Sequence, residues 1–282
     1  MPQNKSTARA TTSAIFVAIG LLQGGFTSPA RSDAKARLLY VRAGQESKQV
    51  ATRLQALGHI SQALVIEPKN PHFWYTKALI LQGMEENEQA LPCIDKSLEF
   101  DPNSAFAWDA KASILSGLGR NEQALAAANE AVRMEACSST RMTRAQVLTH
   151  MGKFYPAEKE LDDIIKADPT NEGARSRRAM VAGHTHHWNK VIEDNTFLIQ
   201  ANKESLVKST STTFQDRAAA YINTKQYDKA IADYKTGLKI NPDSRPLHSG
   251  LLNAYTLSGN TKAAQAERKV LESYDDDITP FK

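Results

Sequence analysis

The sequence contains little cysteine and no large excess of charge of either sign. Its two cysteines form no CxxC pair, so neither a disulfide-stabilised secreted scaffold nor a zinc ribbon is expected. The formal net charge of +4 comes from 35 basic and 31 acidic residues, and this balance argues against nucleic acid as a partner. The 14 glycines and 11 prolines form no long linker-like stretch. Because 41% of the 282 residues are hydrophobic, we expect one continuous, folded and soluble body.

Sequence motifs of common catalytic sites are also missing. The chain has no GxGxxG fingerprint, no GK[ST] phosphate-binding loop, no GxSxG nucleophile elbow and no HExxH zinc motif. The carboxylates occur at helical positions that we expect to be exposed, where charge usually serves solubility. We therefore predict a protein that is not an enzyme and that needs no cofactor.

The first thirty residues have the zones of a secretory signal peptide. Lys5 and Arg9 precede an apolar stretch at residues 14–22, and small residues follow up to Ala30. This order predicts export to the periplasm or the medium, with cleavage after Ala30. No charged residue lies between Arg9 and Arg31, so an uncleaved anchor stays open as an alternative, although its apolar part is short for a membrane span. An anchored chain would be a membrane-tethered assembly factor, and only then would it contact a membrane.

A repeat of 34 residues runs through the rest of the chain. Trp74 and Trp108 are 34 residues apart, and so are Pro68 and Pro102. A small apolar residue recurs near the same period at Ala90, Ala124, Ala157, Val191, Ala230 and Ala264. A five-residue insertion near residues 205–210 interrupts the series. A constant period of this length predicts a repeat architecture.

The apolar residues inside each period are spaced as in two amphipathic helices. They recur at intervals of three and four, first at Trp74, Ala78 and Leu81, and then a break follows at Gly83. Small residues at one matching position would let paired helices approach closely, and these are Ala78, Ala112, Ala145, Ala179 and Ala218. A single helix pair cannot bury its apolar stripe alone, so the pairs should stack on one another.

This pattern resembles the tetratricopeptide repeat. The shared features are the Trp–small–large order of the first helix, a Gly–x–aromatic turn as at Gly152-Lys153-Phe154, and the closing proline; residues 226–234 are similar to the family's second helix. The resemblance implies an all-α fold, an α-solenoid of stacked helix–turn–helix repeats over residues 31–278, with a tail at 279–282. We expect seven repeats, at about 37–70, 71–104, 105–137, 138–171, 172–205, 211–244 and 245–278.

The resemblance also implies a function. In this family the concave wall, formed by the first helices, commonly receives an extended peptide or a partner helix, so we expect a non-catalytic scaffold for a protein or peptide ligand. The corresponding partner-binding positions here are Tyr75, Thr76, Leu79, Asp109, Ser113, Met142, Gln146 and Arg177. Chaperone-binding members clamp a terminal carboxylate with a lysine–asparagine pair and further basic residues, and these positions lack that clamp.

Arginines gather in the first helices of the fourth and fifth repeats. They are Arg141, Arg144, Arg175, Arg177 and Arg178, and stacking should bring several of them towards one region. Arg177 is the best placed to face inward, because it occupies the same place as Thr76, Ala110 and Thr143, which the helical stripe leaves off the core. We predict that acidic residues of the ligand meet Arg177; the alternative is an ordinary solvated face.

Three histidines lie close together where the turn of the fifth repeat is expected. His184, His186 and His187 could hold a divalent cation, which makes a metal-binding protein a further alternative. We prefer a solvent-facing turn in which the adjacent Trp188 packs the second helix, because a stable site needs four well-placed ligands. No metal ligand is therefore assigned.

The two cysteines are too far apart in the repeat to form a disulfide. Cys137 lies ten residues beyond the place that corresponds to Cys93 in the next repeat, an axial offset of about 15 Å. A disulfide requires Cα atoms within about 7 Å, so both thiols should be free.

Overall fold

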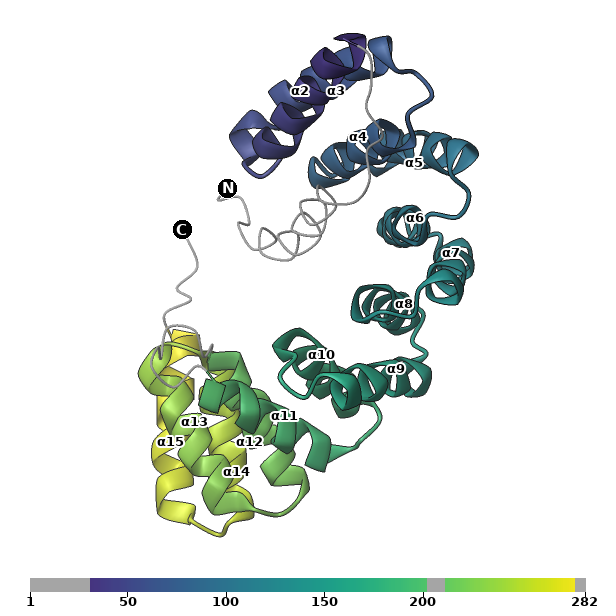
Figure 1. Cartoon of the computed structure of the whole chain (residues 1–282). Helices are drawn as coiled ribbons and strands as arrows, with labels where there is room; N and C mark the ends of the chain where they lie inside the picture. Colours follow the sequence, from purple (N-terminus) through teal and green to yellow (C-terminus); the bar gives the residue numbers. More distant parts are fainter. Residues whose placement is uncertain (1–30, 202–210, 277–282) are drawn as a thin grey trace. The chain divides into compact units, whose positions relative to one another are not determined.

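The computed structural model describes residues 31–201 and 211–276, and every regular element in these two ranges is a helix (Figure 1). The predicted all-α fold of stacked helix–turn–helix repeats is confirmed. Both the predicted signal peptide and the insertion near 205–210 lie outside the described residues. None of the described helices combines the length and the apolar character that a membrane span requires.

Contacts between Cα atoms divide the chain into two compact units, with the boundary between Met151 and Gly152. We call them the N-terminal unit and the C-terminal unit. The composition had predicted one continuous body. No linker marks the boundary, which falls in the turn between two helices; in a repeat protein each repeat contacts only its neighbours, so compact groups form without a linker.

The helices of each unit follow one another as packed neighbours. The N-terminal unit contains α2 (Arg31–Glu46), the 3-10 turn η2 (Val50–Thr52), α3 (Arg53–Ile66), α4 (Pro71–Gly83), α5 (Asn87–Phe100), α6 (Ala105–Gly117), α7 (Asn121–Met134) and α8 (Ser138–His150). The C-terminal unit contains α9 (Phe154–Ala167), α10 (Glu172–His184), α11 (Trp188–Ala201), α12 (Ser211–Asn223), α13 (Tyr227–Ile240), α14 (Arg245–Leu257) and α15 (Thr261–Asp276).

Local sequence explains where the helices begin and turn. The side chains of Asn70, Ser104 and Asn171 accept hydrogen bonds from backbone N–H groups in the first turns of α4, α6 and α10, as N-cap residues do. The turn between helices contains one residue with a left-handed backbone in six repeats: Glu85, Gly119, Gly152, His186, Lys225 and Gly259. Because the left-handed conformation recurs at the corresponding position of each of these repeats, the turn is a fixed part of the repeat.

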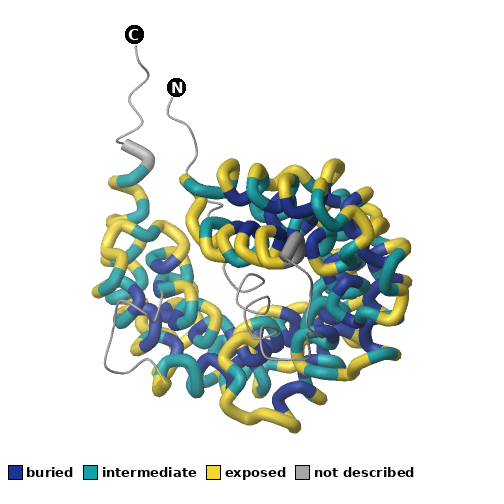
Figure 2. The backbone as a smooth tube through the Cα atoms, turned by 45° about the horizontal axis from the view of Figure 1, so that its top comes forward, coloured by how far each residue is buried: buried dark blue, intermediate teal, exposed yellow. Residues whose placement is uncertain are grey.

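The hydrophobic core is built mainly from small residues between paired helices. Buried positions recur along every helix pair (Figure 2). The five alanines that the sequence placed at one matching position are all buried: Ala78, Ala112, Ala145, Ala179 and Ala218. A larger side chain at such a position would force the helices apart.

A planar N–H donor ties the first helix of four repeats to the preceding turn. In each case a side-chain nitrogen lies close to the carbonyl oxygen of a proline six residues earlier. The pairs are Trp74–Pro68 and Trp108–Pro102, at 2.8 and 3.0 Å, and Arg175–Pro169 and His248–Pro242, both at 2.9 Å. In the fifth repeat an arginine therefore takes the place of the tryptophan.

Candidate partner-binding surface

Seven of the eight predicted partner-binding residues lie on three first helices of the N-terminal unit, α4, α6 and α8. We call these seven the first-helix face: Tyr75, Thr76, Leu79, Asp109, Ser113, Met142 and Gln146. Helix α6 contacts both α4 and α8, and Gln82 Nε2 donates a 2.8 Å hydrogen bond to Ser113 Oγ between α4 and α6. The three helices therefore present one connected surface within this unit.

One feature of this surface differs from the expectation. Thr76 and Ala110 were expected to lie off the core, but their exposed fractions are only 7% and 6%. Ala110 belongs to a buried cluster against which Tyr75 and Leu79 pack. Neighbouring side chains on the first helices thus cover Thr76 and Ala110. The residues that occupy the same position in the next two repeats, Thr143 and Arg177, are half-buried.

Asp109 is a strongly perturbed carboxylate on the first-helix face. Its Oδ1 atom is buried and has no hydrogen-bond partner among the described residues. Burial raises the pKa of Asp109 to about 6, against the opposing effect of a hydrogen bond from Thr143. Tyr75 shares this environment: its pKa is raised by burial, then by the negative charge of Asp109, then by Tyr40. The phenol of Tyr75 is therefore uncharged at neutral pH.

The lysines of α4 and α6 contact other side chains and not Asp109. Lys111 Nζ lies 2.8 Å from Asp95 Oδ1 and 5.2 Å from the ring centroid of Trp108. Lys77 Nζ lies 5.7 Å from the ring centroid of Trp74. These two cations consequently leave the Asp109 carboxylate without an ion pair from its own helix or from α4.

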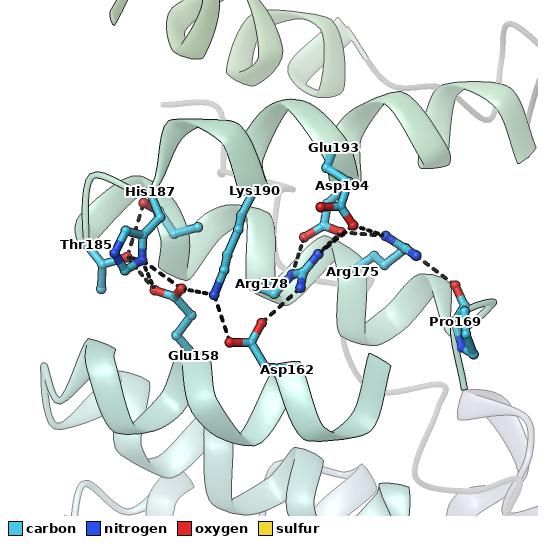
Figure 3. A network of polar contacts seen from close by, with 11 residues as sticks. Glu158, Asp162, Pro169, Arg175, Arg178, Thr185, His187, Lys190, Glu193 and Asp194 are labelled. Carbon is cyan, nitrogen blue, oxygen red and sulfur yellow. Dashed lines mark hydrogen bonds and ion pairs between the residues drawn. The ribbon is translucent and has the colours of Figure 1, made fainter. Parts of the chain in front are cut away.

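The eighth predicted residue, Arg177, lies on α10 in the C-terminal unit. It is half-buried, and burial lowers its pKa. Stacking was expected to bring several arginines towards one region of the ligand-binding wall, but Arg175 and Arg178 are buried. Their guanidinium groups turn towards α9 and α11 because carboxylates of those helices lie within reach (Figure 3).

Asp194 on α11 is the centre of these ion pairs. Its side chain is fully buried, and it accepts hydrogen bonds from Arg175 Nη1 at 2.8 Å and from Arg178 Nε at 2.7 Å. Arg178 also reaches Asp162 of α9 at 2.9 Å. Burial alone would lower the pKa of Arg178, but the bonds with Asp194 and Asp162 raise it overall. Arg175, Arg178 and Asp194 therefore form part of the packed interior and are unavailable to a ligand.

A second carboxylate, Glu158 of α9, extends this network to the turn after α10. It accepts hydrogen bonds from Thr185 and Lys190, and His187 Nδ1 lies 2.7 Å from its Oε1 atom. Burial would raise the pKa of Glu158, but the bonds from Lys190, Thr185 and His187 lower it overall. Lys190 Nζ also lies 2.7 Å from Asp162 Oδ2, so Glu158 and Asp162 share one lysine (Figure 3).

The three histidines of this turn point in different directions. The His184 ring stacks on Phe154 with centroids 4.2 Å apart, and His187 contacts Glu158. His186 holds the left-handed turn position, and its ring lies 5.3 Å from that of Trp188. No group of three or more possible metal ligands comes together in the part of the chain that the structure describes. The metal-binding alternative therefore receives no support from the geometry, whereas Trp188 packs on a buried cluster.

Comparison with known families identifies the repeats. Models of the tetratricopeptide repeat match residues 71–104, 107–136 and 212–244. The chain is a tetratricopeptide-repeat protein. A comparison with curated proteins found no significant match.

Several solved structures share this fold. The type IV pilus biogenesis factor PilW has a TM-score of 0.64 and 21% identity, over 79% of this chain and all of its own. PilF of Pseudomonas aeruginosa gives 0.62 and 16%, over 77% of this chain and 95% of its own. YrrB, a tetratricopeptide-repeat protein with an unusual peptide-binding site, gives 0.57 and 16%, over 67% and 95%. At these identities the likeness concerns the fold alone.

A pairing that was not predicted from the sequence recurs in the C-terminal tetratricopeptide repeats. Arg178 and Asp194 are sixteen residues apart, and so are Arg217 and Asp233, whose Nε and Oδ2 atoms lie 2.7 Å apart. In the N-terminal unit the same spacing joins a lysine to a small residue, at Lys77 and Cys93 and at Lys111 and Ala127. A search for opposite charges at this spacing would have found these two pairs, but it would also have found Arg177 and Glu193, so the spacing alone does not show which arginine faces inward.

Proposed function

We propose that this protein is an exported, non-catalytic scaffold that binds a protein or peptide partner on the first-helix face. The family supports the general role, because tetratricopeptide repeats are typically protein-interaction scaffolds. The observation that carries the proposal is the placement of seven predicted residues on α4, α6 and α8, three helices of one compact unit. All of them except Thr76 are only half-buried, so part of each of these residues remains accessible to a ligand.

Arg177 provides a second proposed contact, for an acidic residue of the partner. Its half-buried guanidinium makes no hydrogen bond or ion pair with the residues that the structure describes. A partially desolvated guanidinium binds a carboxylate more strongly than a fully hydrated one does, and it offers two parallel donors. This contact belongs to the C-terminal unit and is proposed separately from the first-helix face.

A membrane-tethered assembly factor is the second candidate function. Two observations favour it: the apolar stretch at residues 14–22, and the shared fold with PilW, a pilus biogenesis factor. Mass spectrometry of the native N-terminus distinguishes the two candidates. A chain that begins after Ala30 supports an exported scaffold, and a retained N-terminus in the membrane fraction supports the tethered form.

Affinity capture from the native compartment tests the binding surface. The bait is the full chain, as wild type or with Met142→Glu on the first-helix face; Val65→Glu on α3 is the control, because Val65 is 84% exposed and lies on a second helix. We expect a partner that binds the wild type and the control but is lost from Met142→Glu, with equal helical circular dichroism for all three. Equal capture by all three baits would contradict the proposed surface.

A further inference from the structure

We propose that Asp109 forms a subsite for a basic side chain, lysine or arginine, of the bound partner. The inference rests on the proposed function and adds the chemistry of one contact to it. Asp109 lies on α6, the helix that contacts both α4 and α8. A ligand on the first-helix face would therefore meet this residue near the middle of the surface.

The carboxylate has unused hydrogen-bonding capacity. Its Oδ1 atom is buried without a partner in the described residues, and Thr143 is the hydrogen-bond donor that perturbs the group. Most buried side-chain oxygens in folded proteins have a partner, because an unpaired one loses its hydration without compensation. A donor supplied by a ligand would complete the hydrogen bonding of Asp109.

The charge of Asp109 indicates that this donor is a cation. The lysines of α4 and α6 contact Trp74, Trp108 and Asp95 instead, so neither neutralises the carboxylate. A ligand ammonium or guanidinium would supply both the hydrogen bond and the opposite charge, and such charge-assisted bonds are the stronger kind.

The neighbouring side chains fit the stem of a long basic residue. Tyr75 precedes Asp109 by one repeat and Met142 follows it by one repeat, and both are half-buried. The uncharged Tyr75 ring and the flexible Met142 side chain offer apolar surface for a methylene chain and an aromatic face for a cation. A bound metal ion is disfavoured, because no group of three possible ligands surrounds Asp109 among the described residues and hard cations need several oxygens.

A peptide selection tests the inference. Phage displaying random dodecapeptides is selected on the full chain as wild type, as Asp109→Asn, and as Glu122→Gln. The last variant removes an equivalent charge from an exposed position on α7. We expect the wild type and Glu122→Gln to enrich lysine or arginine at one fixed peptide position, and we expect Asp109→Asn to lose that preference.

A double-mutant cycle then measures the contact itself. The enriched peptide is synthesised with its basic residue and with an uncharged replacement, citrulline for arginine or glutamine for lysine. On the wild type the replacement should weaken binding by about tenfold or more, as for a partner of a desolvated charge pair. On Asp109→Asn the two peptides should differ much less.

The outcomes separate this inference from the proposed function. Enriched peptides without a basic preference, or with the same preference on Asp109→Asn, overturn the subsite and leave the scaffold proposal standing. If no variant enriches any peptide, both proposals are overturned. Asp109→Asn is nearly isosteric, and equal circular dichroism of all three variants confirms that the comparison is made between folded proteins.

Discussion

In the N-terminal unit, Lys77 and Lys111 are followed sixteen residues later by Cys93 and Ala127. In the C-terminal unit, Arg178 and Arg217 are followed at the same distance by Asp194 and Asp233. The four later side chains are all buried. In the N-terminal unit the matching lysines lie over tryptophan rings. In the C-terminal unit the matching arginines are paired with the aspartates. At this position the two helices of a repeat therefore pack through small apolar side chains in the N-terminal unit and through ion pairs in the C-terminal unit.

This difference shows that the repeat specifies a geometry and leaves the chemistry of its interior free. At this position the helix pair is packed either by a small residue or by a polar residue whose partners are present. A buried ion pair is not by itself more stable than apolar packing, but removal of one partner is costly because the other charge stays buried. The two units should therefore respond to different mutations.

The largest expected effect is in the charged interior of the C-terminal unit. Asp194→Ala leaves Arg175 and Arg178 without their common buried acceptor, and we expect a loss of ~3–5 kcal/mol in unfolding free energy. Urea denaturation followed by circular dichroism measures this loss. Asp228→Ala, at an exposed position of α13, is the control. Equal midpoints for both variants would remove the distinction between the units.

An oversized side chain should have the next largest effect, in the N-terminal unit. Ala124 is fully buried in α7, so Ala124→Trp should overpack the helix pair and cost ~1–3 kcal/mol. Ala126→Trp places the same side chain at an exposed position of the same helix and should change stability little. An unchanged urea midpoint for Ala124→Trp would contradict the packing of this repeat.

A smaller, pH-dependent effect is expected at Asp109. Its pKa of about 6 exceeds the ordinary value of 3.8, so the folded chain holds the proton more tightly than the unfolded chain does. The stability of the fold therefore falls as the pH rises from about 4 to about 6, and it stays at the lower level above that range. Because the residue is half-buried, solvent reduces this cost. Asp109→Asn should raise the thermal midpoint by about 2–4 °C at pH 7.5, which corresponds to ~1 kcal/mol for a chain of this size.

The same comparison at lower pH identifies the cause of that effect. The groups that face Asp109 are Tyr75 from α4 and Thr143 from α8, and neither titrates between pH 4 and 8. The difference in thermal midpoint between wild type and Asp109→Asn should therefore shrink towards zero near pH 4. A constant difference across this range would show that Asp109 ionises as an exposed carboxylate does.

The smallest effect on stability is expected at Arg177. Arg177→Glu should leave the helical circular-dichroism signal unchanged, because Arg177 makes no ion pair with the described residues. It should weaken binding of an acidic partner and flatten the dependence of affinity on salt. Titrations at low and high salt measure this, with Arg133→Glu on the exposed side of α7 as the matched control. Equal affinity of Arg177→Glu and wild type at low salt would contradict the proposed contact between Arg177 and an acidic residue of the partner.

Much of the architecture was predictable from periodicity. The spacing of Trp74 and Trp108 and the recurring alanines are enough to predict paired helices. Residues on one side of a helix recur every three to four positions, and in a stacked array the whole pattern recurs with each helix pair. Ala78 and Ala124 are fully buried, as close packing at the matching positions requires. These inferences concern one helix and its direct partner, where sequence distance and spatial distance are closely related.

The candidate site was predictable only in part. Tyr75, Asp109 and Met142 share one register position, so the sequence places them on the same side of successive first helices. The burial of Thr76 was missed, because it depends on the size of neighbouring side chains across the helix contact. The unpartnered Oδ1 atom of Asp109 was missed for the same reason.

The sequence by itself determined the repeat, its helices and the side of each helix on which a residue lies. Only the tertiary structure decided that Arg175 and Arg178 turn inward while Arg177 keeps no partner among the described residues. The three arginines lie within four positions of one helix, and their type and spacing do not distinguish them. Their difference arises from carboxylates on α9 and α11, which are distant in sequence and become neighbours only when the helices pack.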